Sequence, residues 1–171
     1  MSYPPIRYTA EKGALNSRFR PASNGPDYVT PADAATAVGP TSGFGTAYHY
    51  LGTGSNTDGE FGLYRVEMGA EATGPSTHFH RTISESFYVL DGRLSLFDGE
   101  RWTVGEAGDF LHVPVGGLHA FRNESGAPVS MLMLFTPGAP REDYFEGLAE
   151  LGQLTDDERR QFFLDHDSYF V

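Results

Sequence analysis

The stretch Thr77–Gly92, THFHRTISESFYVLDG, contains the residues that decide the fold and raise the first question about function. On an extended strand, successive side chains point to opposite faces, so His78 and His80 share one face. A short loop then returns the chain, and we expect Glu85 on the next strand to converge with the two imidazoles. The apolar run FYVL that follows predicts that this second strand is buried.

A convergent set of two histidines and a glutamate has two interpretations. Buried polar groups need partners, and a buried charge without compensation is costly. A divalent cation compensates all three groups together, and their nitrogen and oxygen atoms suit one divalent transition metal (Fe, Mn, Ni, Co or Zn) better than Ca or Mg. Alternatively, the three groups form a hydrogen-bonded cluster without metal. The chain has no cysteine, which excludes thiolate ligands, disulfides and a cysteine nucleophile.

The remainder of the 171 residues predicts an all-β domain between two different ends. Residues 46–137 contain eight short strand-like runs separated by Gly, Asp and Asn turns, which is typical of a β-sandwich or barrel. Residues 1–45 are rich in Pro, Gly, Ala and Ser and predict an N-terminal arm, with a partly disordered terminus as the alternative. Residues 138–171 predict a tail of two short helices, the second opening on Thr155 and Glu158 in capping-box spacing.

Composition limits the partners. The formal net charge of −11, from 12 basic and 23 acidic residues, argues against nucleic acid or an anionic membrane, because both require a basic surface. No apolar run approaches the roughly 18 to 20 residues of a membrane span, and the start lacks the apolar segment of a signal peptide, so we expect a cytoplasmic protein. The run VSMLMLFT (residues 129–136) is apolar on both faces. One face must therefore be covered by the arm, the tail or a second subunit, and we expect a homodimer.

Two motifs in the centre of the chain resemble those of the cupin superfamily. The first is HxH, four residues, Glu, six residues and Gly, and His78, His80, Glu85 and Gly92 match it. The second, in GDFLHVPVGGLHAFRN, is Gly, five residues, Pro-x-Gly, two residues, His, three residues and Asn; its matching positions are Gly108, Pro114, Gly116, His119 and Asn123. The resemblance implies a jelly-roll β-barrel that holds one metal through three histidines and one glutamate: His78, His80, Glu85 and His119.

Two neighbouring positions need separate interpretations. The family pattern has a glycine where this chain has Ala72, and we expect Gly69 and Gly74 to serve the same turn. His112 lies seven residues before His119. We expect His112 to be a hydrogen-bonded structural residue or a pocket wall rather than a ligand, because four ligands already complete a set.

The strand faces also suggest where a substrate would lie. The side chains that share the inward face with the ligands are apolar or aromatic and either line a pocket or fill the core; they are Phe87, Phe121, Met131, Met133 and Phe135. An aromatic wall with few nearby cations suits a neutral or phenolic substrate better than a sugar phosphate, which would call for arginine partners. Arg81, beside the ligands, is the one nearby cation that would reverse this preference.

The stretch after the second motif, through TPGAPREDYFEGLAELG, is similar to bacterial quercetinase-like dioxygenases. That resemblance implies a flavonol, or another phenolic or enolisable small molecule, that meets O2 at the mononuclear metal, with Glu85 as both ligand and catalytic base. Two alternatives remain open. The same ligands can serve a redox-neutral isomerase, cyclase or lyase, and a non-catalytic small-molecule-binding cupin can keep the metal for structure alone.

Overall fold

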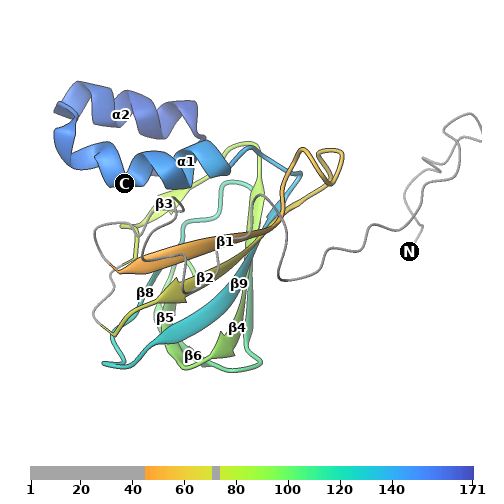
Figure 1. Cartoon of the computed structure of the whole chain (residues 1–171). Coiled ribbons are helices and arrows are strands. Elements are labelled where there is room, and N and C mark those ends of the chain that lie inside the picture. Colours follow the sequence, from red (N-terminus) through yellow and green to blue (C-terminus); the bar gives the residue numbers. More distant parts are fainter. Residues whose placement is uncertain (1–44, 71–73) are drawn as a thin grey trace, which may run out of the picture.

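The computed structural model describes residues 45–70 and 74–171, so the predicted arm (apart from Gly45) and Ala72 lie outside the described residues. Figure 1 shows a β-barrel with the helices gathered at one end. The strands are β1 (Thr46–Gly52), β2 (Gly62–Met68), β3 (His78–Phe79), β4 (Ser84–Asp91), β5 (Arg93–Phe97), β6 (Trp102–Glu106), β7 (Phe110–Val113), β8 (Ala120–Arg122), β9 (Val129–Thr136) and β10 (Tyr169–Phe170). The helical segments are α1 (Glu142–Gly147), the 3-10 segment η2 (Leu148–Gln153) and α2 (Asp156–Asp165).

The strands form two facing groups. The first sheet is antiparallel with the order β1-β2-β9-β4-β7. The second has the order β6-β5-β8, and an antiparallel bridge between His78 and His119 connects it to the pair β3-β10. All eight predicted strands are present, and the arrangement with two short C-terminal helices confirms the all-β jelly-roll fold. The exact division into arm, barrel and tail stays a prediction.

The core lies between the two groups of strands and follows the two-residue period of the strands. Every second residue of β2 and β9 is buried, and Val66 lies opposite Met131 while Tyr64 lies opposite Met133. Phe87 on β4 is fully buried in the same cluster. Each such side chain contributes about 1.5 to 3 kcal/mol through burial, so the inward face of this sheet stabilises the barrel strongly.

The C-terminal segment packs against the barrel through aromatic contacts. The ring of Phe145 on α1 stacks on Tyr48 of β1 with centroids 4.1 Å apart, and the Tyr64 hydroxyl donates to Glu142 Oε1 at 2.6 Å. Helix α2 begins with the predicted capping box of Thr155 and Glu158. In the part of the chain that the structure describes, no helix is both long and apolar enough to cross a membrane.

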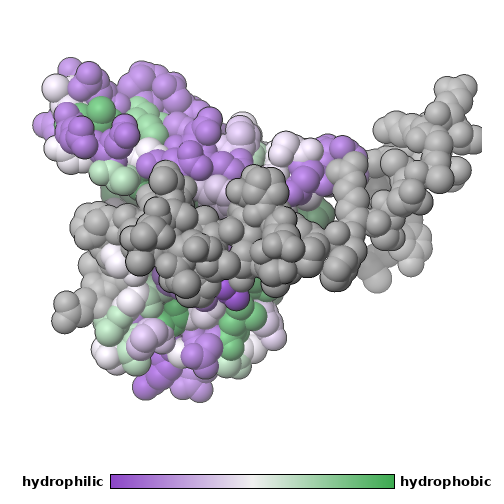
Figure 2. Space-filling view, viewed as in Figure 1, coloured by the Kyte–Doolittle hydropathy of each residue, from purple (hydrophilic) through white to green (hydrophobic). Residues whose placement is uncertain are grey.

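The visible surface differs between the two ends of the molecule. In Figure 2 the helices are mostly hydrophilic, whereas hydrophobic residues gather toward the opposite end of the barrel. Tyr88, Val104 and Phe110, on β4, β6 and β7, are large apolar side chains that remain exposed in this single chain. Leu132 and Leu134, on the outer face of β9, are half-buried. The homodimer stays a prediction, and β7 lies at the edge of its sheet.

Gly74 offers a direct test of how tightly the segment before β3 is held. A Cβ at this position would lie 1.7 Å from the carbonyl oxygen of Phe121. Because that atom belongs to the backbone, Gly74→Ala must displace the chain, and we expect a loss of about 1 to 3 kcal/mol in the free energy of unfolding. Urea denaturation measures this loss. Gly152→Ala is the control, since a Cβ there meets nothing within 4 Å. Equal midpoints for the two variants would contradict the expected loss.

Candidate metal centre

Four buried side chains from both groups of strands converge between the sheets. His78 lies on β3, His80 just after it, and His119 just before β8, while Glu85 reaches across from β4. One ligand atom of each lies within 4.8 Å of the others. His78 and His119 face one another because their backbones exchange two hydrogen bonds, of 3.0 and 2.9 Å. The predicted set is therefore brought together, and its arrangement can bind a metal ion.

Each of the three imidazoles is oriented by a backbone carbonyl. The Nδ1 atoms donate to Ser76 O at 2.9 Å from His78, to Asp167 O at 2.6 Å from His80 and to Gly117 O at 3.0 Å from His119. A carbonyl oxygen only accepts, so the proton of each neutral ring resides on Nδ1 and leaves the Nε2 lone pair free. Outer partners of this kind fix the tautomer and orientation of metal-binding histidines.

The carboxylate of Glu85 lies among these rings. Its Oε2 is 2.8 Å from His119 Nε2 and 3.1 Å from His80 Nε2. Burial alone would raise the pKa of Glu85, but the hydrogen bonds and charges of the two imidazoles lower it well below its usual range. Burial lowers the pKa of His119, but the Glu85 carboxylate more than offsets this and raises it. The pKa of His78 falls to about 3, chiefly through burial and the neighbouring His119.

These observations bear on the two interpretations of the cluster. Without metal, a proton on His119 compensates the Glu85 carboxylate as a hydrogen-bonded ion pair. With metal, three inward Nε2 atoms and one carboxylate oxygen provide a donor set typical of divalent transition metals. The carbonyl on every Nδ1 fits the second interpretation, because it leaves Nε2 of each ring as the metal-binding atom and the ligand atoms of the four residues lie within 4.8 Å of one another.

A cavity of about 490 Å³ adjoins the cluster and is bordered by His78 and Glu85. Three of the five predicted substrate-binding residues line it, namely Phe121, Met133 and Phe135. The other two, Phe87 and Met131, are fully buried in the core and are not among the residues of the cavity wall. The volume is in the range of small-molecule sites. Whether these residues contact a substrate stays a prediction.

The wall opposite the barrel comes from the C-terminal segment, which the strand pattern did not place at the site. Tyr144, Phe145 and Phe163 contribute aromatic rings, and Arg141, a residue that is only 3% exposed, contributes a guanidinium. The sequence analysis did not place Arg141 at the site, because the chain returns over the barrel only after β9. The only signal in the sequence was an arginine at the start of a helix, which gives no information on tertiary position.

The other two polar residues singled out by sequence lie outside the cluster. Arg81 is exposed, and its guanidinium lies 4.1 Å from the ring centroid of Tyr169. His112 is also exposed and hydrogen-bonds through Nδ1 to Ser86 Oγ at 2.9 Å. This placement agrees with a structural role for His112.

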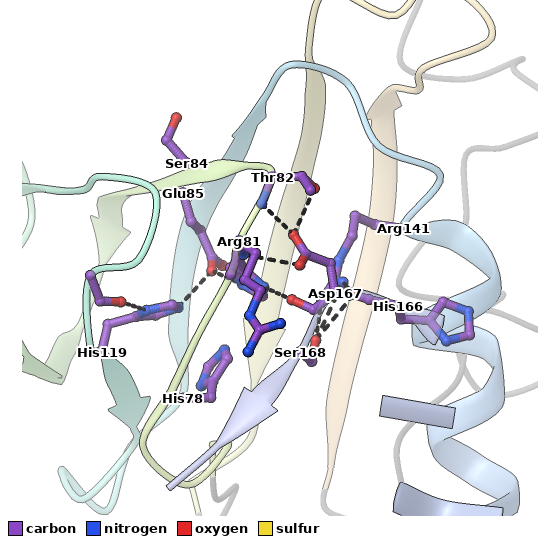
Figure 3. A network of polar contacts seen from close by, with 12 residues as sticks. His78, Arg81, Thr82, Ser84, Glu85, His119, Arg141, His166, Asp167 and Ser168 are labelled. Carbon is purple, nitrogen blue, oxygen red and sulfur yellow. Dashed lines mark hydrogen bonds and ion pairs between the residues drawn. The ribbon is translucent and has the colours of Figure 1, made fainter. Parts of the chain in front are cut away.

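A turn near the C-terminus supports the metal centre. Asp167 adopts a positive φ of 53°, a conformation that Asp tolerates better than most residues. Its carboxylate accepts hydrogen bonds from the backbone N–H groups of Arg81 and Thr82, both at 2.9 Å, and from Thr82 Oγ1 at 2.7 Å. Figure 3 shows this turn beside the ligand-bearing loop. Because the Asp167 carbonyl also orients His80, the turn couples the tail to a ligand residue.

Comparisons with known proteins agree with this geometry. The protein-family model of the cupin domain matches residues 63–135 of this chain. The quercetin 2,3-dioxygenase of Bacillus subtilis is 28% identical over 145 residues, which are 81% of this chain and 41% of that protein. The polyketide synthase CurC of Streptomyces cyaneus is 30% identical over 102 residues, 59% of this chain and 64% of that protein. The chain thus spans less than two thirds of the length of either relative.

A solved structure supports the fold. The RmlC-like cupin from Shewanella frigidimarina superimposes with a TM-score of 0.54 at 23% identity, covering 70% of this chain and 96% of that one. At this identity the likeness concerns the fold alone.

Removing the Asp167 side chain tests whether the turn supports the cluster. In Asp167→Ala, the loss of three hydrogen bonds and the strain of Ala at positive φ should release the carbonyl that orients His80. We expect Co(II) affinity to fall about 10- to 100-fold, as is typical when an outer partner is removed. Competition with a chromophoric chelator measures the affinity. The matched control is Asp165→Ala, an exposed carboxylate on α2. Unchanged affinity in a folded Asp167→Ala protein would show that the turn does not support the site.

Proposed function

Because the chain belongs to the cupin superfamily and four ligand-type side chains converge inside its barrel, we propose that it is a metal-dependent enzyme acting on a small molecule. In this proposal His78, His80, Glu85 and His119 hold one divalent transition metal. The observation that carries it is the cavity of about 490 Å³ that borders His78 and Glu85. A purely structural metal would need no such space beside its ligands.

The reaction that we propose is oxygenation of a phenolic or enolisable substrate, as in quercetinases. The similarity to quercetin 2,3-dioxygenase supports it, since it extends over 145 residues and so beyond the segment of the cupin domain model. When bound, the metal would supply a Lewis acid and a centre at which substrate oxygen and O2 can meet. The apolar side chains of Phe121, Met133 and Phe135 would hold the body of the substrate and exclude water.

Glu85 is the proton acceptor in this proposal. It borders the cavity, so its carboxylate is accessible to the hydroxyl of a bound substrate. Hydrogen bonds from His80 and His119 lower its pKa and oppose the effect of burial. The carboxylate is therefore ionised, which is the form that accepts a proton.

A redox-neutral reaction is the second candidate. The similarity to a protein named polyketide synthase favours it, because polyketides contain enolisable carbonyl groups. An isomerase, cyclase or lyase would use the same four ligands and the same base without consuming oxygen. The non-catalytic binding cupin is less well supported, since the cavity reaches the ligand residues.

Oxygen uptake separates these candidates. We expect protein reconstituted with Fe(II), Mn(II), Co(II) or Ni(II) to consume O2 with a flavonol or another enolisable phenol, with one metal most active. His119→Ala should lose this activity, at least about 100-fold, because it removes one ligand and the partner of Glu85. His112→Ala should retain it, because His112 is exposed and outside the cluster.

Two results would contradict the dioxygenase. Flat oxygen traces while metal binds stoichiometrically would favour redox-neutral chemistry, which substrate loss followed by mass spectrometry would then detect. Equal metal binding by His119→Ala and the unmodified protein would contradict the ligand set itself.

A further inference from the structure

Arg141 is a buried cation that lines the cavity, and among the described residues no carboxylate pairs with it. It precedes α1, is 3% exposed and borders the cavity that adjoins Glu85. Its guanidinium carbon lies 4.0 Å from the ring centroid of Tyr144 and 5.0 Å from that of Phe135. Within residues 45–70 and 74–171, no acidic side chain forms an ion pair with it, and Glu85 is engaged by His80 and His119.

The hydrogen bonds of Arg141 leave donors unused. A guanidinium has five N–H groups. Nη1 donates to the carbonyl of His166 at 2.5 Å, and the two Nη atoms make long contacts of 3.5 Å with Ser168 Oγ. The guanidinium also interacts with the side chain of Tyr144. Nε is buried and has no hydrogen-bond partner. Figure 3 shows the side chain directed toward Ser168 and His166, on the same side of the site as the Asp167 turn.

Such a group is costly unless a ligand completes it. Rings that stack on the guanidinium offset part of the cost of burying the charge, but an unmade hydrogen bond in a buried site retains its full penalty. The planar fork of a guanidinium matches a carboxylate, with which it forms charge-assisted hydrogen bonds. Apart from Ser76 and the ligand residues His78 and Glu85, the rest of the cavity wall is mostly apolar or aromatic. It therefore suits a ligand with one anionic end and an apolar body.

We propose that Arg141 is the anion-binding residue of the cavity and that the substrate carries a carboxylate. The carboxylate binds at Arg141, the apolar body lies against Phe121 and Met133, and the reacting group faces Glu85. This assignment adds a substrate class to the proposed function. Only the placement of the reacting group at Glu85 rests on that function, because recognition of the carboxylate by Arg141 does not require metal. It replaces the neutral substrate that the sequence suggested.

The competing explanation is that Arg141 only clamps the turn at residues 166–168 through its bond to the His166 carbonyl. A clamp stabilises the fold but does not distinguish an anionic from a neutral ligand. Selectivity between two ligands of one shape therefore separates the two explanations, and stability alone does not.

Calorimetric titration with hydrocinnamate and with its neutral amide tests the proposal. The full chain is used after EDTA treatment and again after loading with Co(II). We expect the carboxylate to bind at least about tenfold more tightly than the amide in both states, the effect of one charge-assisted hydrogen bond. Arg141→Met should reduce the preference to about one, and Arg141→Lys should retain part of it. Arg122→Met is the matched control, because Arg122 also covers an aromatic ring, that of Trp102 at 3.9 Å, but is half-exposed and outside the cavity wall.

Two kinds of result overturn the proposal, and a third separates it from the proposed enzyme. If Arg141→Met still prefers the carboxylate over the amide, the anion is held elsewhere. The same conclusion follows if the preference appears only after Co(II) loading and is the same in the unmodified protein and in Arg141→Met. If the unmodified protein shows no preference, or binds neither ligand, the cavity is not an anion site; this result does not depend on any variant folding. A third result is that Co(II) does not bind, while the EDTA-treated unmodified protein prefers the carboxylate and Arg141→Met does not. This result would contradict the proposed metal-dependent enzyme and support the anion site.

Discussion

The buried carboxylate of Glu85 is the constraint on which the site depends. A charge in this position between two sheets requires compensation, which His80 and His119 supply through their contacts with the carboxylate. The rings of these two residues and of His78 are oriented by carbonyls at Ser76, Asp167 and Gly117. Those carbonyls come from two loops and the C-terminal turn. The barrel therefore cannot form this cluster from β3, β4 and β8 alone, and its polar centre requires most of the domain to be folded.

The C-terminal segment has a structural and a functional part in that arrangement. Strand β10 pairs with β3, and the turn before it holds both the loop at Arg81 and the ring of His80. The same segment covers the cavity with aromatic side chains and Arg141. The tail thus orients His80 and also forms part of the cavity wall, so we expect a change in the tail to alter metal affinity and ligand selectivity together.

The sequence predicted the parts of this structure that depend on local periodicity and turn chemistry. Alternation places His78 and His80 on one face, and the return of the chain places Glu85 opposite them; both follow from strand geometry. The capping box at Thr155 was likewise readable from spacing. The strand β10 was missed because two residues show no period, and the position of Arg141 was missed because only tertiary packing determines it. Phe87 and Met131 share the inward face but lie in the core, since one face of a sheet can border both core and cavity.

The residues that local sequence patterns predict and the residues that only tertiary packing places give different information about function. The ligand set comes from short motifs, and the same set suits oxidative and redox-neutral chemistry. The cavity wall also includes residues after Pro137, among them Arg141, so the cavity is bordered by a guanidinium as well as by the carboxylate of Glu85. A substrate of the kind that we propose would carry its anionic group at a fixed distance from its reacting group. In that proposal, specificity depends on the spacing between Arg141 and Glu85, and the apolar side chains of the wall limit the length and shape of the substrate.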